Sequence, residues 1–411
     1  MRAGRDPGES GPPLVRLAAV LACLGALARA AHADESAVDC SIPPTSPSWT
    51  PLVELIPPPR PPEQPLRRAP EIDVRSFGAR GDGQSDDTAA INRAFAALPA
   101  DGGSVHFPAG EYVVSSNLDL VVGKRNVEVY GDGMFVSILR RTAVPGSGRN
   151  FGVISVAKGV NWTIRDLGIV GDASRWSPFN HFGKGIYFVD SPGSVIFRVE
   201  VARAEGEGIY ASGDSPGTRM LENFVRHGHG AALNLNSSRT TSEGSVIADN
   251  VVLDNRSGAV QATASRLTVQ GNLAFFPWPL GSDIILIVNA GQFSCNQNLV
   301  LDSDISAAGV SPIHLWVNDG LPMQGDVCGN RILNVRMAHD RRGGGAGIHI
   351  DGASGPIRVR SNVVSSVASP GPPGQPAIRI NGAPMQRFCL EANSFAAGPG
   401  TASCDSASSI W

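Results

Sequence analysis

Apolar residues fall into short runs of four or five along most of this chain, and one phrase of such runs recurs from about residue 185 onward. A strand that begins at a small residue is followed by a turn, a second strand, an asparagine and a third apolar run. The first strands of the phrase lie at 185–188, 208–211, 231–235, 259–262, 284–288, 313–316, 347–350 and 377–380. Short strands in coils of 22–32 residues are typical of a parallel β-solenoid with three strands per turn. The pattern therefore predicts an all-β fold, a parallel β-helix.

An asparagine stands at the same place in each coil, at Asn223, Asn250, Asn272, Asn298, Asn330, Asn362 and Asn393. Asparagine tolerates left-handed backbone angles, and its amide can hydrogen-bond to the next coil. We expect a structural ladder of these amides. A leucine-rich repeat is excluded, because its regular Leu-x-x-Leu-x-Leu phrase is absent.

A single helix is predicted before the repeats. Ser85 or Asp86 is placed to cap it, and apolar residues follow with helical spacing at Ala90, Ile91, Ala94 and Phe95. We expect this helix to cover the first coil as an N-terminal cap. Asp82, Asp86 and Asp87 are then turn and cap residues and not catalytic acids.

The two ends of the chain differ from its interior. Arginines precede an apolar run at 17–28, and Ala31-His32-Ala33 follows, which predicts a secretory signal peptide over 1–33. Residues 34–69 are proline-rich and predict an extended arm. The β-helix domain is expected over 70–400, with a C-terminal tail over 401–411. The protein is expected to be secreted, either to the periplasm or outside the cell.

The composition of the chain limits the classes of partner and cofactor that we expect. The net charge of −3 gives no basis for a nucleic-acid or membrane-surface partner, and the apolar run near the N-terminus is too short to span a bilayer. With 48 glycines and 31 prolines the chain is turn-rich without being disordered in composition. Six cysteines suggest pairings between Cys389 and Cys404 and between Cys295 and Cys328, and no Cys/His spacing indicates a metal site. No cofactor is expected.

Ionisable residues recur in front of three consecutive first strands. Lys184, Glu207 and His229 are 23 and 22 residues apart. Stacked coils lie about 4.8 Å apart, so residues at equivalent positions form a column. This spacing predicts a cation, a carboxylate and an imidazole at one corner. A solvent-exposed row of salt bridges is the alternative, because a turn before a strand faces water.

The opening of the domain resembles a known family. Residues 72–92, which include Phe77-Gly-Ala-Arg-Gly-Asp-Gly, and residues 102–112 are similar to the start of pectate-lyase-like and polygalacturonase-like right-handed β-helix proteins. The resemblance implies that the fold is a right-handed parallel β-helix and that the protein is carbohydrate-active. Gly228-His229-Gly230 matches the histidine motif of polygalacturonases. Lys184, however, stands where that family has an aspartate, and Glu207 stands where it has the second of an Asp-Asp pair, so that mechanism does not carry over intact.

The expected activity is cleavage of the glycosidic bonds of a polysaccharide that contains uronates, by hydrolysis or by elimination, with epimerisation of a uronate as an alternative. An inverting hydrolase needs two carboxylates about 6.5–9.5 Å apart; Glu205 and Glu207 are the candidates, with Asp190 or Asp214 as substitutes. In β-elimination or epimerisation of a uronate, a cation neutralises the sugar carboxylate while a tyrosine or histidine moves the C5 proton. Lys184, His229 and Tyr210 supply those residue types. The catalytic candidates are therefore Lys184, Glu207, His229, Glu205, Tyr210 and Asp214.

Aromatic and basic residues near this column are candidates for contact with a polysaccharide. They lie in two loops, in the neighbouring strands and further along the first-strand series: Trp176, His181, Tyr187, His227, Trp278, His314, Trp316 and His349. A non-catalytic glycan-binding surface protein is the competing class. Gathering of Lys184, Glu207 and His229 in one cleft favours an enzyme, and dispersal favours a binding protein.

Overall fold

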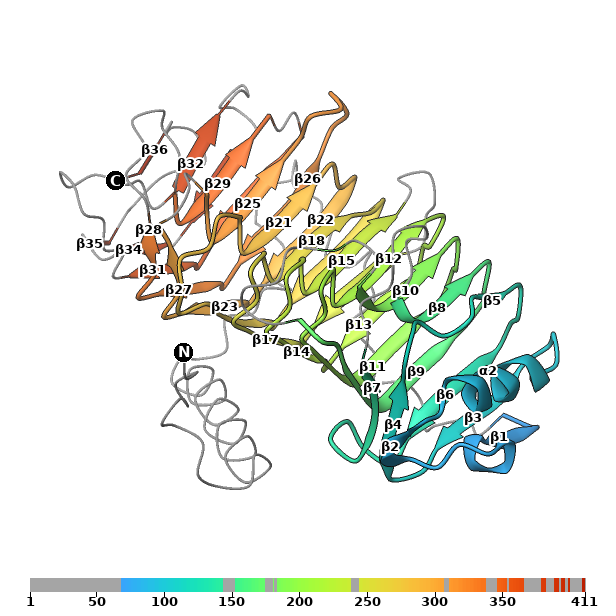
Figure 1. Ribbon diagram of the computed structural model, residues 1–411. Helices are drawn as coiled ribbons and strands as arrows, with labels where there is room; N and C mark the ends of the chain where they lie inside the picture. The colour runs from blue at the N-terminus through green and yellow to red at the C-terminus, as the bar shows by residue number, and fades with distance from the viewer. Residues whose placement is uncertain are drawn as a thin grey trace, which may run out of the picture. The chain divides into compact units, whose positions relative to one another are not determined.

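The computed structural model describes residues 68–142, 152–173, 180, 183–237, 244–306, 310–337, 346–352, 355–365, 378–381, 388–391, 393–395, 398–399 and 409–410. The expected signal peptide and proline-rich arm lie outside these residues. In the described part, successive coils stack strand on strand, as the blue-to-red order of Figure 1 shows. The predicted right-handed parallel β-helix is confirmed.

One face of the coils is an 11-stranded sheet. Its neighbouring strands are parallel, except for the antiparallel last pair. The strands follow one another in chain order: β5 (Val121–Val122), β8 (Gly152–Ala157), β10 (Lys184–Val189), β12 (Ile209–Gly213), β15 (Leu233–Ser237), β18 (Val260–Thr263), β21 (Ile285–Val288), β25 (Ile313–Trp316), β29 (Ile348–Asp351), β32 (Ile378–Asn381) and β36 (Ser409–Ile410).

The other two faces form two ladders that share the long strands β9 (Thr163–Val170) and β11 (Val195–Ala202), where a residue with positive φ (Asp166 or Arg198) lies at the bend. The first ladder also contains β1 (Glu71–Asp73), β3 (Gly103–Phe107), β6 (Val127–Gly131), β13 (Arg219–Leu221), β16 (Gly244–Ala248), β19 (Arg266–Gln270), β22 (Gln292–Asn296), β26 (Gln324–Cys328), β30 (Ile357–Arg360) and β33 (Phe388–Glu391).

The second ladder contains β2 (Asp82–Asp86), β4 (Gly110–Val114), β7 (Ser137–Arg141), β14 (Phe224–Arg226), β17 (Val251–Leu253), β20 (Leu273–Phe275), β23 (Leu299–Leu301), β27 (Arg331–Leu333), β31 (Val363–Ser365), β34 (Ser394–Phe395) and β35 (Gly398–Pro399). A separate pair joins β24 (Asp304–Ile305) and β28 (Arg336–Met337). Each coil therefore carries three strands, as predicted.

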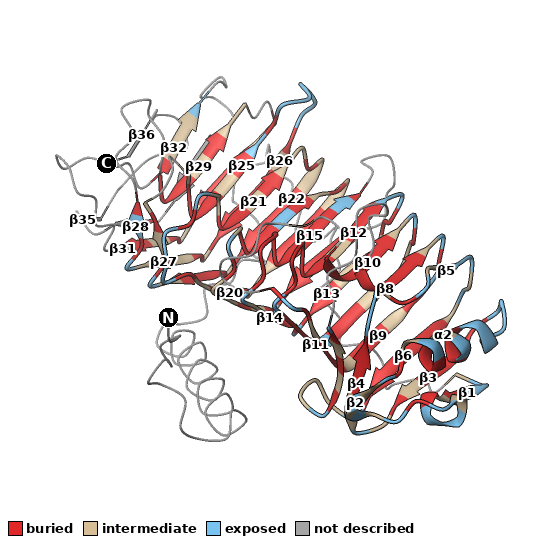
Figure 2. Ribbon diagram, viewed as in Figure 1, coloured by how far each residue is buried: buried red, intermediate tan, exposed pale blue. Residues whose placement is uncertain are grey.

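Alternate residues of every strand point inward and form one continuous core. In the 11-stranded sheet the inward positions are aliphatic or aromatic, for example Ile186 and Phe188 in β10 and Ile313 and Leu315 in β25, and all are buried. Figure 2 shows this as largely red strands along the stack. Burial of these rows, at about 25 cal/mol per Å² of apolar surface, is the main force holding the coils together.

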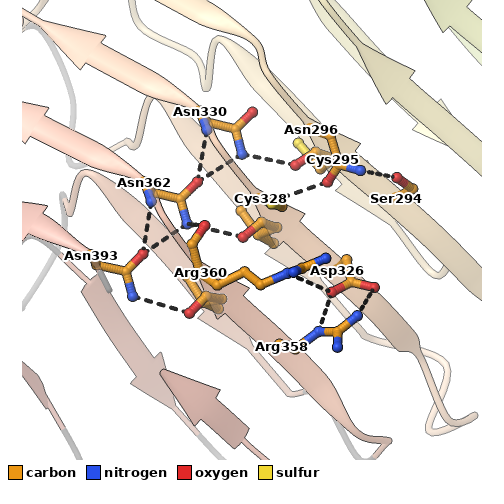
Figure 3. Close-up of polar contacts among 12 residues, drawn as sticks. Ser294, Cys295, Asn296, Asp326, Cys328, Asn330, Arg358, Arg360, Asn362 and Asn393 are labelled. Atoms are coloured by element: carbon orange, nitrogen blue, oxygen red, sulfur yellow. Dashed lines mark hydrogen bonds and ion pairs between the residues drawn. The ribbon is translucent and has the colours of Figure 1, made fainter. Parts of the chain in front are cut away.

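The predicted asparagine ladder is present. From Asn223 to Asn393, Nδ2 of each asparagine donates to Oδ1 of the next at 2.9 Å, and all seven side chains are buried. Figure 3 shows its C-terminal part. The left-handed backbone lies one residue earlier than expected. Residues such as Asp249 and Gln297 have positive φ, which turns the chain so that each following asparagine points at its neighbour.

Helix α2 (Thr88–Ala97) packs at the N-terminal end of the stack and buries Ala90, Ile91, Ala94 and Phe95, as predicted. A short 3-10 helix, η2 (Val74–Phe77), precedes it. The expected cap is partly wrong: the N-cap residue is Asp87, whose carboxylate accepts from the Arg80 and Gly81 N–H groups. The predicted cap residue Asp86 instead accepts a hydrogen bond from the N–H of Thr88, the first residue of the helix.

The expected Cys295–Cys328 bridge is wrong, because Cys295 is a free, buried thiol whereas Cys328 is in a disulfide. The other expected pair involves the Cys389 and Cys404 side chains, which lie outside the described part. Among the described helices, none has the length and apolar character needed to cross a membrane.

Candidate functional site

The outward positions of the 11-stranded sheet form columns along the stack. The register aligns one column through Tyr187, Tyr210, Asn234, Gln261, Leu286, His314, His349 and Arg379. Because the coils pair without slippage in this sheet, side chains up to about 190 residues apart in sequence share one outer surface. We call this row of eight residues the outer column.

A buried ion pair lies at the corner where the outer column begins. Lys184 opens β10 and has no exposed surface, and its Nζ lies 3.0 Å from Oε2 of Glu207, which is also buried. The ammonium also lies over two aromatic rings, 5.6 Å from the ring centre of Tyr187 and 5.3 Å from that of Tyr210. The expected meeting of Lys184 and Glu207 is present. The alternative of a solvent-exposed salt-bridge row is wrong, because both charges are buried.

The two tyrosines stack against each other, with ring centres 5.4 Å apart and planes at 22°. The Tyr187 hydroxyl lies 3.1 Å from Oγ of Ser212, while Tyr210 is partly exposed. Burial raises the pKa of Tyr210, so its phenol is protonated near neutral pH, although hydrogen bonds from Asn236 and Ser212 act in the other direction. Burial also lowers the pKa of Lys184, and the carboxylate of Glu207 opposes this.

A second buried ion pair lies next to the first. Glu205 contacts Arg141 of β7, and both side chains are fully buried. The Asp172 N–H donates to Oε1 of Glu205 at 2.7 Å, and Arg141 also donates to Oδ1 of Asn117 at 2.7 Å. Burial lowers the pKa of Arg141 to about 10. Glu205 thus binds a different cation from Glu207, and both of its oxygens are occupied.

Arg141 was missed by the sequence analysis. A signal for it exists: Leu139 and Arg141 have the same parity in β7, and Leu139 points into the core. A charged residue at an inward position needs a partner. The pattern therefore predicts that Arg141 forms an ion pair with a buried acidic residue, but it does not identify that residue as Glu205.

His229 does not occupy the position predicted for it. The register pairs Ile209 with Leu233, so the equivalent of Glu207 is Ala231, and Gly208 N–H donates to the Ala231 carbonyl. His229 lies two residues earlier, with its N–H bonded to the Ala204 carbonyl at 3.0 Å. Its side chain is buried in the coil that follows Glu207. The coil between Glu207 and its structural equivalent therefore contains two residues more than the spacing of Glu207 and His229 indicated.

The remaining predicted residues are dispersed. Asp214 is exposed in a turn, where its N–H donates to Oδ1 of Asp190 at 3.0 Å. His227 follows β14 in the second ladder, with its Nε2 3.8 Å from Oδ2 of Asp254. Trp278 is exposed in the loop between β20 and β21. Trp176 and His181 lie outside the described residues.

His314, Trp316 and His349 gather further along the same sheet. The rings of His314 and His349 stack with centres 4.5 Å apart, and Trp316 stacks on His314 at 6.3 Å. Burial, and then the neighbouring His314, lower the pKa of His349 to about 4. Within the described residues, one group able to hold a metal ion is found: His314, His349 and Asp351, whose ligand atoms lie within 4.8 Å of one another.

Comparison with known proteins agrees with this architecture. Residues 71–275 match a family model described as rhamnogalacturonase A/epimerase, pectate lyase-like. The mannuronan C5-epimerases AlgE2 and AlgE1 of Azotobacter vinelandii are 47% identical over 75 residues and 36% identical over 152 residues. These matches cover 17% and 34% of this chain, and 8% and 11% of the relatives. The chain therefore spans only a small part of the length of these curated relatives.

Solved structures share the fold at low sequence identity. The Streptococcus pneumoniae surface adhesin PfbA has a TM-score of 0.55 at 12% identity, covering 79% of this chain and 91% of that one. An exopolygalacturonase from Thermotoga maritima has a TM-score of 0.50 at 11% identity, covering 83% and 94%. These likenesses show the fold alone. The family model over residues 71–275, together with the opening motif, shows that the chain belongs to the pectate-lyase-like, polygalacturonase-like superfamily of right-handed parallel β-helix proteins.

Proposed function

We propose that the protein binds a uronate-containing polysaccharide along the outer column and moves the proton at C5 of one uronate, the step common to epimerisation and β-elimination. The observation that carries this proposal is the pair of stacked phenols, Tyr187 and Tyr210, above the buried Lys184 ammonium. The mannuronan C5-epimerases and an alginate lyase among the relatives support uronate chemistry.

The chemistry required is limited. Loss of the C5 proton to a base moves its electron pair into the sugar carboxylate. In epimerisation a proton returns to C5 from the opposite face. In elimination the pair forms the C4–C5 double bond, the C4–O bond breaks, and the departing oxygen takes a proton. Both outcomes need a proton donor at neutral pH.

Tyr210 fits the donor role, since it is partly exposed and burial keeps its phenol protonated. When the phenol gives up its proton, the ammonium of Lys184, 5.3 Å from the ring centre, favours the phenolate. Lys184 has no exposed surface, so it acts through the tyrosines and is a positioning residue. Glu207 fixes the ammonium in place. His229, in the next coil, is the candidate for the base.

Hydrolysis by two carboxylates is less well supported. Glu205 is bound to Arg141 and the Asp172 N–H, and Glu207 is bound to Lys184, so neither carboxylate is placed as a free acid or base. An inverting pair needs one carboxylic acid and one carboxylate with a water between them.

The test is incubation in D₂O with mannuronan, polyguluronate and polygalacturonate. Deuterium at C5 by NMR reports proton transfer, ultraviolet absorbance reports new unsaturated uronates, and reducing ends without that absorbance report hydrolysis. Tyr210→Phe is expected to lower C5 exchange by about 10²–10⁴-fold. Tyr112→Phe is the matched control, because it removes a tyrosyl hydroxyl from β4, in a different sheet.

Two results would count against the proposal. Reducing ends with neither C5 deuterium nor the absorbance of unsaturated uronates would make the protein a hydrolase. Glycan binding with neither C5 exchange nor unsaturated product, unchanged in Tyr210→Phe, would make it a binding protein. We also propose that residues 1–33 direct export; an intact N-terminus on protein recovered from whole cells, with none in the periplasm or medium, would exclude it.

A further inference from the structure

The group His314, His349 and Asp351 lies on two adjacent strands of the 11-stranded sheet. His314 of β25 is directly opposite His349 of β29, and their rings are parallel within 7° at 4.5 Å. Asp351 is two residues beyond His349, so it is on the same outer side of the sheet. One ligand atom from each of the three residues lies within 4.8 Å of the other two. No metal site was expected from the sequence, because no Cys/His spacing in it indicates one; the two histidines are 35 residues apart.

His314 is held as metal-binding histidines are held. Its Nδ1 lies 2.9 Å from Oδ2 of Asp283, and the other oxygen of Asp283 accepts from Ser311 N–H at 2.7 Å. A carboxylate on Nδ1 places the ring proton there, which leaves a lone pair on Nε2. That Nε2 is buried and has no hydrogen-bond partner among the described residues. A buried acceptor without a partner is costly, and a cation would satisfy it.

His349 is held at one nitrogen by a donor instead of a carboxylate. Nδ2 of Asn381, the residue aligned with Asp351 on the next strand, donates to Nε2 of His349 at 2.9 Å, so the proton of the neutral ring lies on Nδ1. A metal at Nδ1 requires the Asn381 amide to turn, so that its oxygen accepts from the Nε2–H of His349. Both imidazoles are therefore fixed at one ring nitrogen by a neighbour from another coil. The charges also favour a cation, because the carboxylates of Asp283 and Asp351 outnumber the one guanidinium beside them, that of Arg379.

We propose that His314, His349 and Asp351 bind one divalent transition-metal ion of the zinc class, with water in the remaining position. Two imidazoles and a carboxylate suit zinc, whereas calcium prefers a shell of oxygen ligands. Ligand atoms bound at about 2.0–2.2 Å lie roughly 3.3 Å apart in a tetrahedral site. The ligand atoms therefore need to converge by up to about 1.5 Å. Because the lone pair of an imidazole nitrogen lies in the ring plane, at least one of the two stacked rings must also turn out of the parallel stack for both to face one ion.

The test uses the full chain without a histidine tag, freed of metal by a chelator. Zn²⁺ is titrated in competition with a chromophoric chelator, and Co²⁺ is titrated while its visible d–d spectrum is recorded. We expect one ion per chain with micromolar or tighter affinity, and a tetrahedral Co²⁺ spectrum. His349→Gln and Asp351→Asn should remove this binding. Asp283→Asn keeps all three ligands and should weaken it about 10–100-fold.

His106→Gln is the matched control, since His106 also pairs with a carboxylate, that of Asp132 at 2.8 Å, but lies in β3. It should leave binding unchanged. The proposal is overturned if the wild-type protein binds neither Zn²⁺ nor Co²⁺ saturably, if Ca²⁺ competes equally, or if His349→Gln binds as the wild type does. If a ligand variant fails to fold, the wild-type Co²⁺ spectrum and the Asp283→Asn titration still decide.

Discussion

The Lys184–Glu207 pair allows a direct test of whether the corner serves stability or chemistry. The perturbation is a double-mutant cycle of Lys184→Met, Glu207→Gln and the combined variant. The two charges lie 3.0 Å apart with the ammonium fully buried. Their Coulomb attraction at an effective dielectric of about 20 is roughly 5 kcal/mol, most of which is offset by the loss of hydration.

Removing one partner leaves the other charge buried alone. We expect Glu207→Gln to lower the free energy of unfolding by about 3–5 kcal/mol, and the double variant to lie within about 1 kcal/mol of the wild type. Lys184→Met should cost less than Glu207→Gln, because the Glu207 side chain is 11% exposed and that of Lys184 is not. Retained stability with lost C5 exchange in the double variant would separate the chemical role from the structural one.

The pH dependence of Glu207→Gln follows from the same burial. Burial already lowers the pKa of Lys184, and the substitution removes the carboxylate that opposes this. Between the lowered folded pKa and the unfolded value of 10.5, the unfolded chain binds more protons than the folded one, so stability should rise with pH. The loss in this variant should therefore be greatest at neutral pH and smaller at alkaline pH.

Urea denaturation followed by tryptophan fluorescence measures each variant, with the midpoint as the quantity compared. The control is Arg336→Met, which removes an exposed pair with Asp304 at 3.6 Å and should cost less than about 1 kcal/mol. The reasoning is refuted if the two single substitutions add up in the double variant, or if Glu207→Gln costs no more than the control.

Three further results are expected. Asn298→Ala removes the acceptor of two N–H donors of Asn272 and should lower the free energy of unfolding by about 2–5 kcal/mol in urea denaturation, whereas the exposed Asn318→Ala should cost less than about 1 kcal/mol. Burial raises the pKa of Cys295 to about 12, so this thiol should resist alkylation near neutral pH until the protein unfolds; rapid labelling of Cys295 itself in folded protein would contradict this. Hydrogen bonds from Thr88 and Ser115 lower the pKa of Asp86 to about 2, so this carboxylate stabilises above its unfolded pKa of 3.8 and the benefit is lost as pH falls toward 2; denaturation midpoints of Asp86→Asn should be flatter than wild type over that range.

The repeat could be predicted from the sequence because the same types of residue are needed at equivalent positions of successive coils. Every coil needs an inward apolar pair on the sheet, and each coil from Asn223 onward adds one amide to the ladder. These constraints give a visible period in residues such as Asn250 and Asn272. Helix α2 was predictable for the same reason, since its apolar spacing is local. Local signals do not fix the number of residues between strands, and so they placed His229 two residues away from its true register.

The contacts between coils that could not be predicted from the sequence are those outside the recurring positions of the repeat. His314 and His349 meet because the coil between them happens to close after 35 residues, and Glu205 meets Arg141 across 64 residues. The periodic pattern does not predict such pairs, because a single substitution in one coil can create one without changing the repeated sequence pattern. The alternation of side chains along β7 predicts that Arg141 points inward, but the sequence near Arg141 does not identify its partner.

The corner of the 11-stranded sheet holds two cations and two carboxylates in buried or nearly buried positions, namely Lys184, Arg141, Glu207 and Glu205. Buried ion pairs generally add little stability over apolar residues of the same size, because the cost of removing the charges from water offsets their attraction. The positions equivalent to Lys184 and Glu207 in later coils hold Ala231, Gly258, Asp283 and Ser311, so the same fold is maintained there without a Lys–Glu pair. The four charges are therefore better explained by what they position, the two stacked phenols at the start of the outer column, than by the stability that they contribute.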